Sequence, residues 1–170
     1  MVQKIVNVLP AIGLPGQKVA TDSARYLSYN PLSDGSVKVG AFVFAKTAGG
    51  TQAAPFAIVS ATGAGGDAIP LGFVERVMDV ALQEEVRGTD VLPEGAVVTV
   101  AIQGQFYIEV PEGLKAITAG MGVYVKPVTG AINFAKKASE GEVDTGFKVV
   151  IPNGGVNADA DDIVIIEKFN

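Results

Sequence analysis

Apolar residues alternate with polar or small residues along much of the second half of the chain, in short runs that end at glycine. The runs are residues 97–102 (VVTVAI), 106–110 (FYIEV), 122–134 (GVYVKPVTGAINF), 147–151 and 163–166. A period of two places successive side chains on opposite faces of a strand, so the runs predict short strands. Gly104 predicts a break between the first two strands, and residues 128–130 predict the turn of a hairpin.

The middle of the chain has the same character with less regularity. Asp34-Gly35 predicts a turn, and it is followed by strand patterns at 37–43 (VKVGAFV), 56–61 (FAIVSA) and 71–77 (LGFVERV). Residues 78–86 have mixed spacing and leave a strand and a short helix as open alternatives. Short strands separated by glycine turns, with little room for crossover helices, predict an all-β fold, either a small β-barrel or a β-sandwich.

The first 33 residues differ from the rest of the chain. They contain Pro10, Pro15 and Pro31 among small and polar residues, and residues 22–27 are compatible with a single helical turn. Proline fixes φ and has no N–H donor, so this stretch is expected to be extended and unable to form a core alone. We therefore expect an extended N-terminal arm (1–33) that lies on another surface, and a β-barrel or β-sandwich domain formed by residues 34–170.

The composition narrows the functional classes. The 170 residues include no histidine, cysteine or tryptophan, which removes imidazole bases, thiol nucleophiles and nitrogen or sulfur metal sites. The formal net charge of -5 argues against nucleic acid and anionic membranes as partners. Because only 18% of residues are charged, against about 25% in a typical soluble domain, we expect a surface that binds other proteins.

One short pattern suggests hydrolytic chemistry. Asp144-Thr145-Gly146 matches the core of the aspartic proteases, in which two carboxylates share a proton and activate water. A single copy requires a homodimer, and Phe147 stands where those enzymes have a small residue. A solvated turn that opens a strand is the favoured interpretation, and the homodimeric protease using Asp144 stays as an alternative.

Two further patterns suggest ligand sites, and each lacks an essential part. Residues 63–68 (GAGGDA) fit a dinucleotide-binding loop, but Pro70 leaves no helix to face a pyrophosphate. The acidic loop 157–162 resembles the start of a calcium-binding loop, but it lacks the glycine and the final glutamate of an EF-hand. We expect no catalytic residue, no cofactor and no metal site, and leave open whether the acidic loop binds a cation.

The arm carries the best candidates for contact with a partner protein. Tyrosine and arginine anchor interfaces because they supply large area or several donors at modest entropy cost, and an extended segment can lay apolar side chains along another subunit. The predicted interface residues are Ile5, Val8, Leu9, Ile12, Leu14, Arg25, Tyr26 and Tyr29. The alternative that the tyrosines hold the arm on its own domain stays open.

Five segments together resemble the capsid cement, or decoration, proteins of tailed bacteriophages. They are residues 28–43 (SYNPLSDGSVKVGAFV), 70–77 (PLGFVERV), 92–110 (LPEGAVVTVAIQGQFYIEV), 119–134 (AGMGVYVKPVTGAINF) and 161–169 (DDIVIIEKF). The resemblance implies a compact, β-tulip-like domain with an N-terminal arm. It also implies a structural protein of the virion, bound to the outer surface of the phage head.

From this resemblance we expect a protein that is made in the host cytoplasm, binds the major capsid protein and stabilises contacts between its subunits. A homo-oligomer is expected on the head, with a trimer favoured, and no enzymatic activity. A β-module of a phage tail or baseplate is a further alternative.

Overall fold

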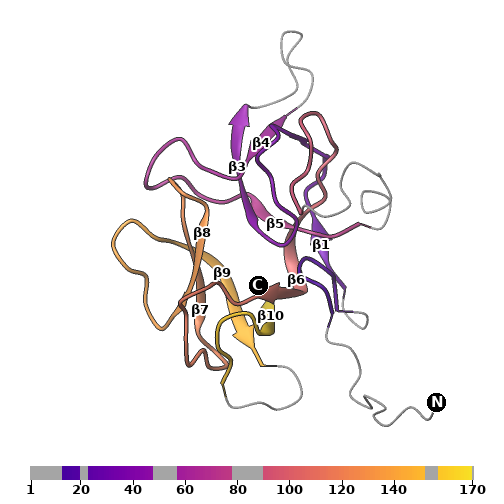
Figure 1. Ribbon diagram of the computed structural model, residues 1–170. Coiled ribbons are helices and arrows are strands. Elements are labelled where there is room, and N and C mark those ends of the chain that lie inside the picture. The colour runs from indigo at the N-terminus through magenta and orange to yellow at the C-terminus, as the bar shows by residue number, and fades with distance from the viewer. Residues whose placement is uncertain (1–12, 20–22, 48–56, 78–89, 152–156, 170) are drawn as a thin grey trace, which may run out of the picture.

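The computed structural model describes residues 13–19, 23–47, 57–77, 90–151 and 157–169, and these contain ten strands and no helix (Figure 1). The strands are β1 (Arg25–Tyr26), β2 (Leu32–Ser33), β3 (Phe42–Thr47), β4 (Ile58–Ser60), β5 (Gly72–Val74), β6 (Val100–Glu109), β7 (Gly122–Lys126), β8 (Ala131–Ala135), β9 (Val143–Val150) and β10 (Ile163–Lys168). The all-β prediction is confirmed. Residues 78–86 lie outside the described ranges, and within those ranges nothing has the form of a membrane-spanning helix.

The strands form one sheet whose two halves meet at β6. The order is β2-β4-β3-β5-β6-β10-β9-β7-β8, and the neighbours are antiparallel except for β2 and β4. The ten residues of β6 pair first with β5, at Val100 and Ala101, and then with β10 from Gly104 to Glu109. Figure 1 shows β3 to β5 above β6 and β7 to β10 below it and to the left.

The first half of the sheet is buried on both faces at the start of β3 and along β5. In β3, Phe42 and Phe44 point into the main core, whereas Val43 points into a second, smaller core. In β5, Phe73 points into the main core and Val74 points into the smaller one. Successive side chains of a strand face opposite sides, so a strand between two cores needs apolar residues at every position. This explains why β3 begins with the sequence FVF and β5 is GFV.

Four phenylalanine rings join the two halves of the sheet. The Phe73 ring lies 5.4 Å from Phe42 on β3, 5.3 Å from Phe106 on β6 and 6.4 Å from Phe147 on β9, measured between ring centroids. Phe42 also contacts Phe147 edge-on at 5.6 Å. All four side chains are essentially inaccessible to solvent. Rings in such edge and tilted arrangements stabilise each other beyond the area they bury, so Phe73 fixes how the halves pack.

The described part of the N-terminal arm runs along the second edge of β6. The Gly16 N–H donates to the Tyr107 carbonyl at 2.8 Å, and the Tyr107 N–H donates to Gln17 at 2.9 Å. Further along, β1 pairs with β6 at residues 101–103. The arm thus satisfies backbone groups that β6 leaves open, and the surface on which these residues lie is the chain's own domain. The domain boundary at residue 33 stays a prediction.

Three local predictions are corrected by the structure. The helical turn expected within residues 22–27 is wrong at Arg25 and Tyr26, which form a strand because β6 offers backbone partners there. The break expected at Gly104 is absent, because β6 continues through this glycine at φ +127°. Ala24 packs so closely here that a Cβ atom on residue 104 would lie 2.9 Å from the Cβ of Ala24. The strand expected at 37–43 begins only at residue 42, because Gly40 turns at φ +79°.

We predict that Gly72→Ala destabilises the fold by about 1 to 3 kcal/mol. A Cβ atom on Gly72 would lie 2.4 Å from the Ala101 carbonyl oxygen and 2.8 Å from a Val100 methyl group, so β5 would have to move away from β6. Urea unfolding measures the change in free energy. The matched control is Gly66→Ala, where a Cβ meets nothing within 4 Å. Equal unfolding midpoints for the two variants would contradict the packing argument.

Candidate functional site

Four of the predicted interface residues lie along the arm on the outward side of β6. Leu14 is 60% exposed, Tyr29 is 48% exposed and Tyr26 is 36% exposed. Arg25 is also exposed, and its guanidinium donates to the Gln103 side chain at 3.3 Å. The structure therefore places these four along one edge of the sheet. The other four predicted residues, Ile5, Val8, Leu9 and Ile12, lie outside the described ranges.

Val97 is a further exposed apolar side chain that lies beside the arm. It pairs with Leu32, while its neighbour Val98 donates its N–H to the Pro31 carbonyl at 2.9 Å. Val97 is 51% exposed and Val98 is fully buried. The alternation in residues 97–102 predicts that one valine of this pair faces outward, but not that it lies beside the arm. Leu14, Arg25, Tyr26, Tyr29 and Val97 are called the arm surface below.

Two further exposed apolar side chains lie in neighbouring loops and were not predicted. Ile69, in the loop between β4 and β5, is 77% exposed, and Val128, in the turn between β7 and β8, is 59% exposed. The two loops touch, because the Gly63 N–H donates to the Pro127 carbonyl at 2.9 Å. Ile69 stands beside Ala68 and Pro70 and Val128 follows Pro127, and the sequence gives no sign that the two loops meet.

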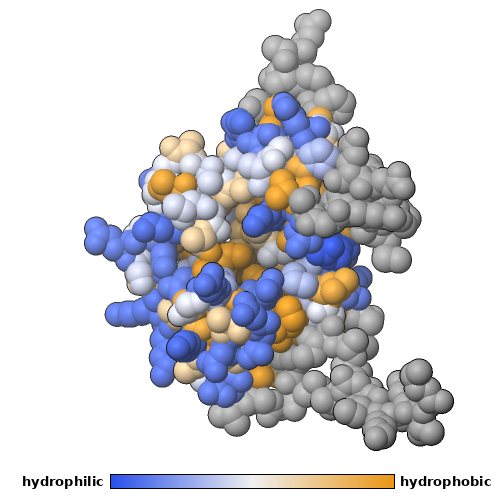
Figure 2. All heavy atoms as spheres, viewed as in Figure 1, coloured by the Kyte–Doolittle hydropathy of each residue, from blue (hydrophilic) through white to orange (hydrophobic). Residues whose placement is uncertain are grey.

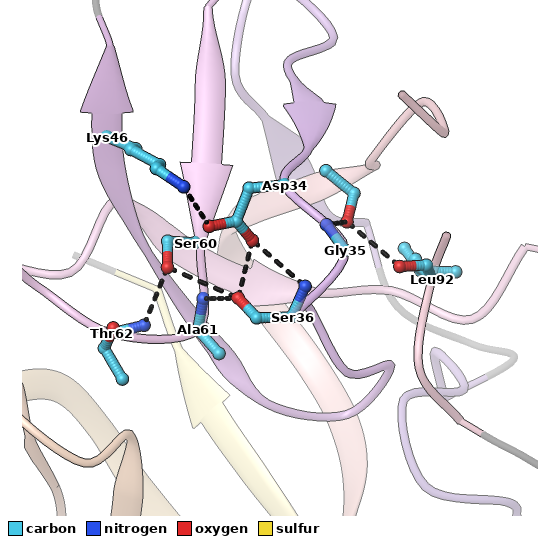
Figure 3. Close-up of polar contacts among 9 residues, drawn as sticks. Asp34, Gly35, Ser36, Lys46, Ser60, Ala61, Thr62 and Leu92 are labelled. Carbon is cyan, nitrogen blue, oxygen red and sulfur yellow. Dashed lines mark hydrogen bonds and ion pairs between the residues drawn. The ribbon is translucent and has the colours of Figure 1, made fainter. Parts of the chain in front are cut away.

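The turn at Asp34 is fixed by a polar network (Figure 3). One Asp34 carboxylate oxygen accepts hydrogen bonds from the backbone N–H and the hydroxyl of Ser36, and the other binds the Lys46 ammonium at 2.9 Å. The Ser36 hydroxyl also accepts the Ala61 N–H at 3.1 Å and lies 3.3 Å from the Ser60 hydroxyl. The network thus ties the predicted turn to β3 and to the end of β4.

The same network changes the acidity of Asp34. Burial by itself raises the pKa of the carboxyl group, but hydrogen bonds from Ser36 and Lys46 favour the ionised form and lower its pKa to about 2. The Asp34 side chain is 11% exposed, whereas that of Lys46 is 57% exposed. The hydrogen bonds and the ion pair thus stabilise the ionised carboxylate, and Asp34 acts as a structural anchor of the turn.

Asp144 lies inside β9 rather than in the expected turn, and that expectation is wrong. The pairing between β7 and β9 is irregular here, with Gly146 at φ +76°. The Asp144 carboxylate accepts the Gly146 N–H at 2.8 Å, and the buried Thr145 hydroxyl donates to the Val123 carbonyl at 2.7 Å. Asp144 itself is exposed. These residues shape a bulge in an exposed part of a strand.

The acidic loop uses its carboxylates to hold backbone. Asp159 accepts the Ala116 N–H at 2.8 Å, and Asp162 accepts the Asp159 N–H at 2.8 Å. Across the described ranges, no three acidic side chains gather in a way that could hold a metal ion. The glycine-rich loop after β4 leads into β5 without a helix, so it offers no helix N-terminus to a phosphate.

We predict that acid weakens the fold partly through Asp34. Because its pKa is about 2 in the folded protein and near 3.8 in the unfolded chain, its contribution is complete above about pH 4 and is lost as the pH falls to about 2. In the wild type, the free energy of unfolding should fall by about 1 to 2 kcal/mol more between pH 5 and pH 2 than it does in Asp34→Asn. The figure is kept low because solvent screens the exposed Lys46 ammonium. Urea unfolding from pH 5 to pH 2 measures this difference. Equal slopes for variant and wild type would contradict the assignment.

Comparison with solved structures supports the fold assignment. One chain, from "The capsid of Myoviridae Phage XM1", is similar to this protein with a TM-score of 0.61. The match covers 98% of this chain and 93% of that chain. The sequence identity is 14%, so the similarity shows a shared fold and nothing further. A search of curated proteins finds no significant match to the sequence.

Comparison with protein families is more specific. A family described as "Structural cement protein (E217 gp24/Pam3 gp6)" matches residues 2–168, nearly the whole chain. The match includes all ten strands and most of the arm, and it agrees with the resemblance found in the five sequence segments. It gives no support to a protease or to a tail or baseplate module. With an all-β fold and exposed apolar side chains on an anchored arm, this chain belongs to the family of phage structural cement proteins.

Proposed function

We propose that this capsid cement protein binds the outer surface of a phage head and stabilises contacts between subunits of the major capsid protein. The observation that carries the proposal is the arm surface, where apolar and tyrosine side chains stand exposed on a segment whose backbone is already held by β6. Such a segment loses little further backbone freedom on binding, so more of the interaction energy appears as affinity.

The proposed mechanism is burial of apolar area across the seams between capsid subunits. Each square ångström of apolar surface removed from water contributes about 25 cal/mol, before the costs of association are subtracted. A protein that binds the assembled shell and not the free subunits shifts the equilibrium toward the shell. Many copies acting on many seams add their small contributions over the head.

The protein acts without catalysis in this proposal. The Asp144 carboxylate accepts the Gly146 N–H within an irregular part of β9, which gives it a role in the strand's own geometry. The family is named for a structural role. The chain is made in the host cytoplasm and takes up its place when the head is assembled.

The proposed assembly on the head is a homotrimer. The low charge content and the exposed apolar side chains on both the arm surface and the loops favour contact between copies as well as with the capsid. Closed symmetry would bury such side chains in equivalent places on each copy. Neither nucleic acid nor membrane is a partner in this proposal, since the formal net charge is -5.

We predict that Tyr29→Ala weakens binding to heads about tenfold or more, which corresponds to about 1.4 kcal/mol. Tyr29 is 48% exposed, so the variant should keep the unfolding midpoint of the wild type. Co-sedimentation with purified heads that lack this protein measures the affinity. Asp144→Asn is the control, because its amide oxygen can still accept the Gly146 N–H. If Tyr29→Ala binds heads as tightly as the wild type, the arm surface is not the binding surface. If Asp144→Asn no longer stabilises heads, the Asp144 carboxylate has a chemical role that this proposal does not include.

We also predict the arrangement on the head. Cryo-electron microscopy of heads saturated with the protein should show density on the outer surface, in groups of three copies that touch one another. Isolated copies without mutual contact would reject the trimer while leaving the cement role in place. Density on the inner surface would reject the proposed location.

A further inference from the structure

A groove of about 700 Å³ opens between the two halves of the sheet. Its lining comes from the segment before β3, from the end of β6 and the residues after it, and from the region of β8. The apolar residues of the lining include Val39, Ala41, Ile108, Val110 and Ile132, with Pro15 of the arm. A cleft of this volume has the size of sites that bind drug-sized ligands, and it suits a few residues of an extended chain.

The floor of the groove is apolar. Ile108 and Val110 are almost fully buried in the main core, and Ile132 is half-buried against it. Val39 packs on the smaller core from the other side. Figure 2 shows hydrophobic residues gathered in the middle of the view, between hydrophilic residues to the left and below. Because Ile108 and Val110 are already buried, the apolar surface that an occupant would cover belongs to the half-buried Val39 of the first half and Ile132 of the second.

The rim of the groove is acidic. It carries Asp90, Glu109, Glu112 and Asp161, against the single cation Lys38. Asp90 is neutralised by the guanidinium of Arg76. Within the described ranges the other three carboxylates form no ion pair, so three negative charges face one positive charge and the net charge of the lining is -2. This field attracts a cation and repels an acidic partner.

The neighbouring backbone favours an extended occupant. β8 contributes Ile132 to the groove and is the last strand of the sheet, so in the described part of the chain only β7 pairs with it. Its sequence, AINFA, contains no charge or proline that would block a further strand. An unguarded edge of this kind can accept main-chain hydrogen bonds from an added segment.

We propose that this groove binds an extended, positively charged segment of the capsid protein, with apolar side chains on the floor and lysine or arginine against the rim. The inference rests on the proposed cement function and adds the chemistry of the partner. A second copy of this chain is a poorer occupant, because a protein of net charge -5 meets a lining of net charge -2. Binding here would also couple the two halves of the sheet, since each supplies part of the lining.

The test compares two variants that remove the same charge from exposed positions. Glu109→Gln with Glu112→Gln neutralises the rim, and Glu94→Gln with Glu140→Gln is the control outside the groove. The rim variant should bind heads that lack the protein about fivefold or more weakly than the control at 50 mM salt. The difference should shrink at 0.5 M salt, where charges are screened over a few ångströms. Unchanged urea midpoints show that both variants fold.

The outcomes separate the inference from the cement function. If the wild type binds heads and the two variants bind equally well, the groove assignment is wrong and the cement function stands. If the wild type does not bind heads at all, the cement function fails and the groove assignment falls with it. Sedimentation velocity of the free proteins tests the other occupant: a rim variant that changes self-association but not head binding assigns the groove to a second copy and overturns the proposal.

Discussion

The packing of Phe73 against three other phenylalanine rings is the constraint on which the rest of the structure depends. It sits on a three-residue strand between β3 and β6, and its ring reaches Phe147 on β9 in the other half of the sheet. Its neighbour Gly72 can have no side chain, because β6 lies too close. One ring and one missing Cβ together set the distance and the angle between the halves. The groove between them exists because this junction is fixed.

The long strand β6 connects this junction to the arm that carries the proposed binding residues. One edge of β6 joins both halves of the sheet, and its other edge holds the arm through hydrogen bonds such as the one from Gly16 to Tyr107. The arm is therefore extended yet ordered where it is described, with Tyr26 and Tyr29 on its outer side. A cement protein acts by surface contact, so a rigid display of a few large side chains serves it better than a catalytic pocket.

The carboxylates of this protein have two different roles, one in holding the fold together and one in selecting a partner. Asp34 is surrounded by Ser36 and Lys46, which hold it ionised and lock a turn to two strands. Glu109 and Glu112, by contrast, stand at a groove without a cation paired to them among the described residues. Unpaired charge at a rim contributes little to folding stability, but it discriminates between partners. The two kinds of carboxylate look alike in the sequence.

The sequence by itself determined the strand pattern, the absence of imidazole and thiol chemistry, and the resemblance that led to the cement family, because these depend on residue type and on neighbours along the chain. It failed where residues distant in the chain meet. β6 runs on through Gly104 because β10 pairs with it there, at Lys168, and residues 25 and 26 form a strand because β6 offers them partners. Four residues of the arm surface could be named from the sequence, but the place of Val97 beside the arm could not. The contact between the loops of Ile69 and Val128 and the groove with its acidic rim were decided by tertiary structure, since each joins segments that only the folded sheet brings together.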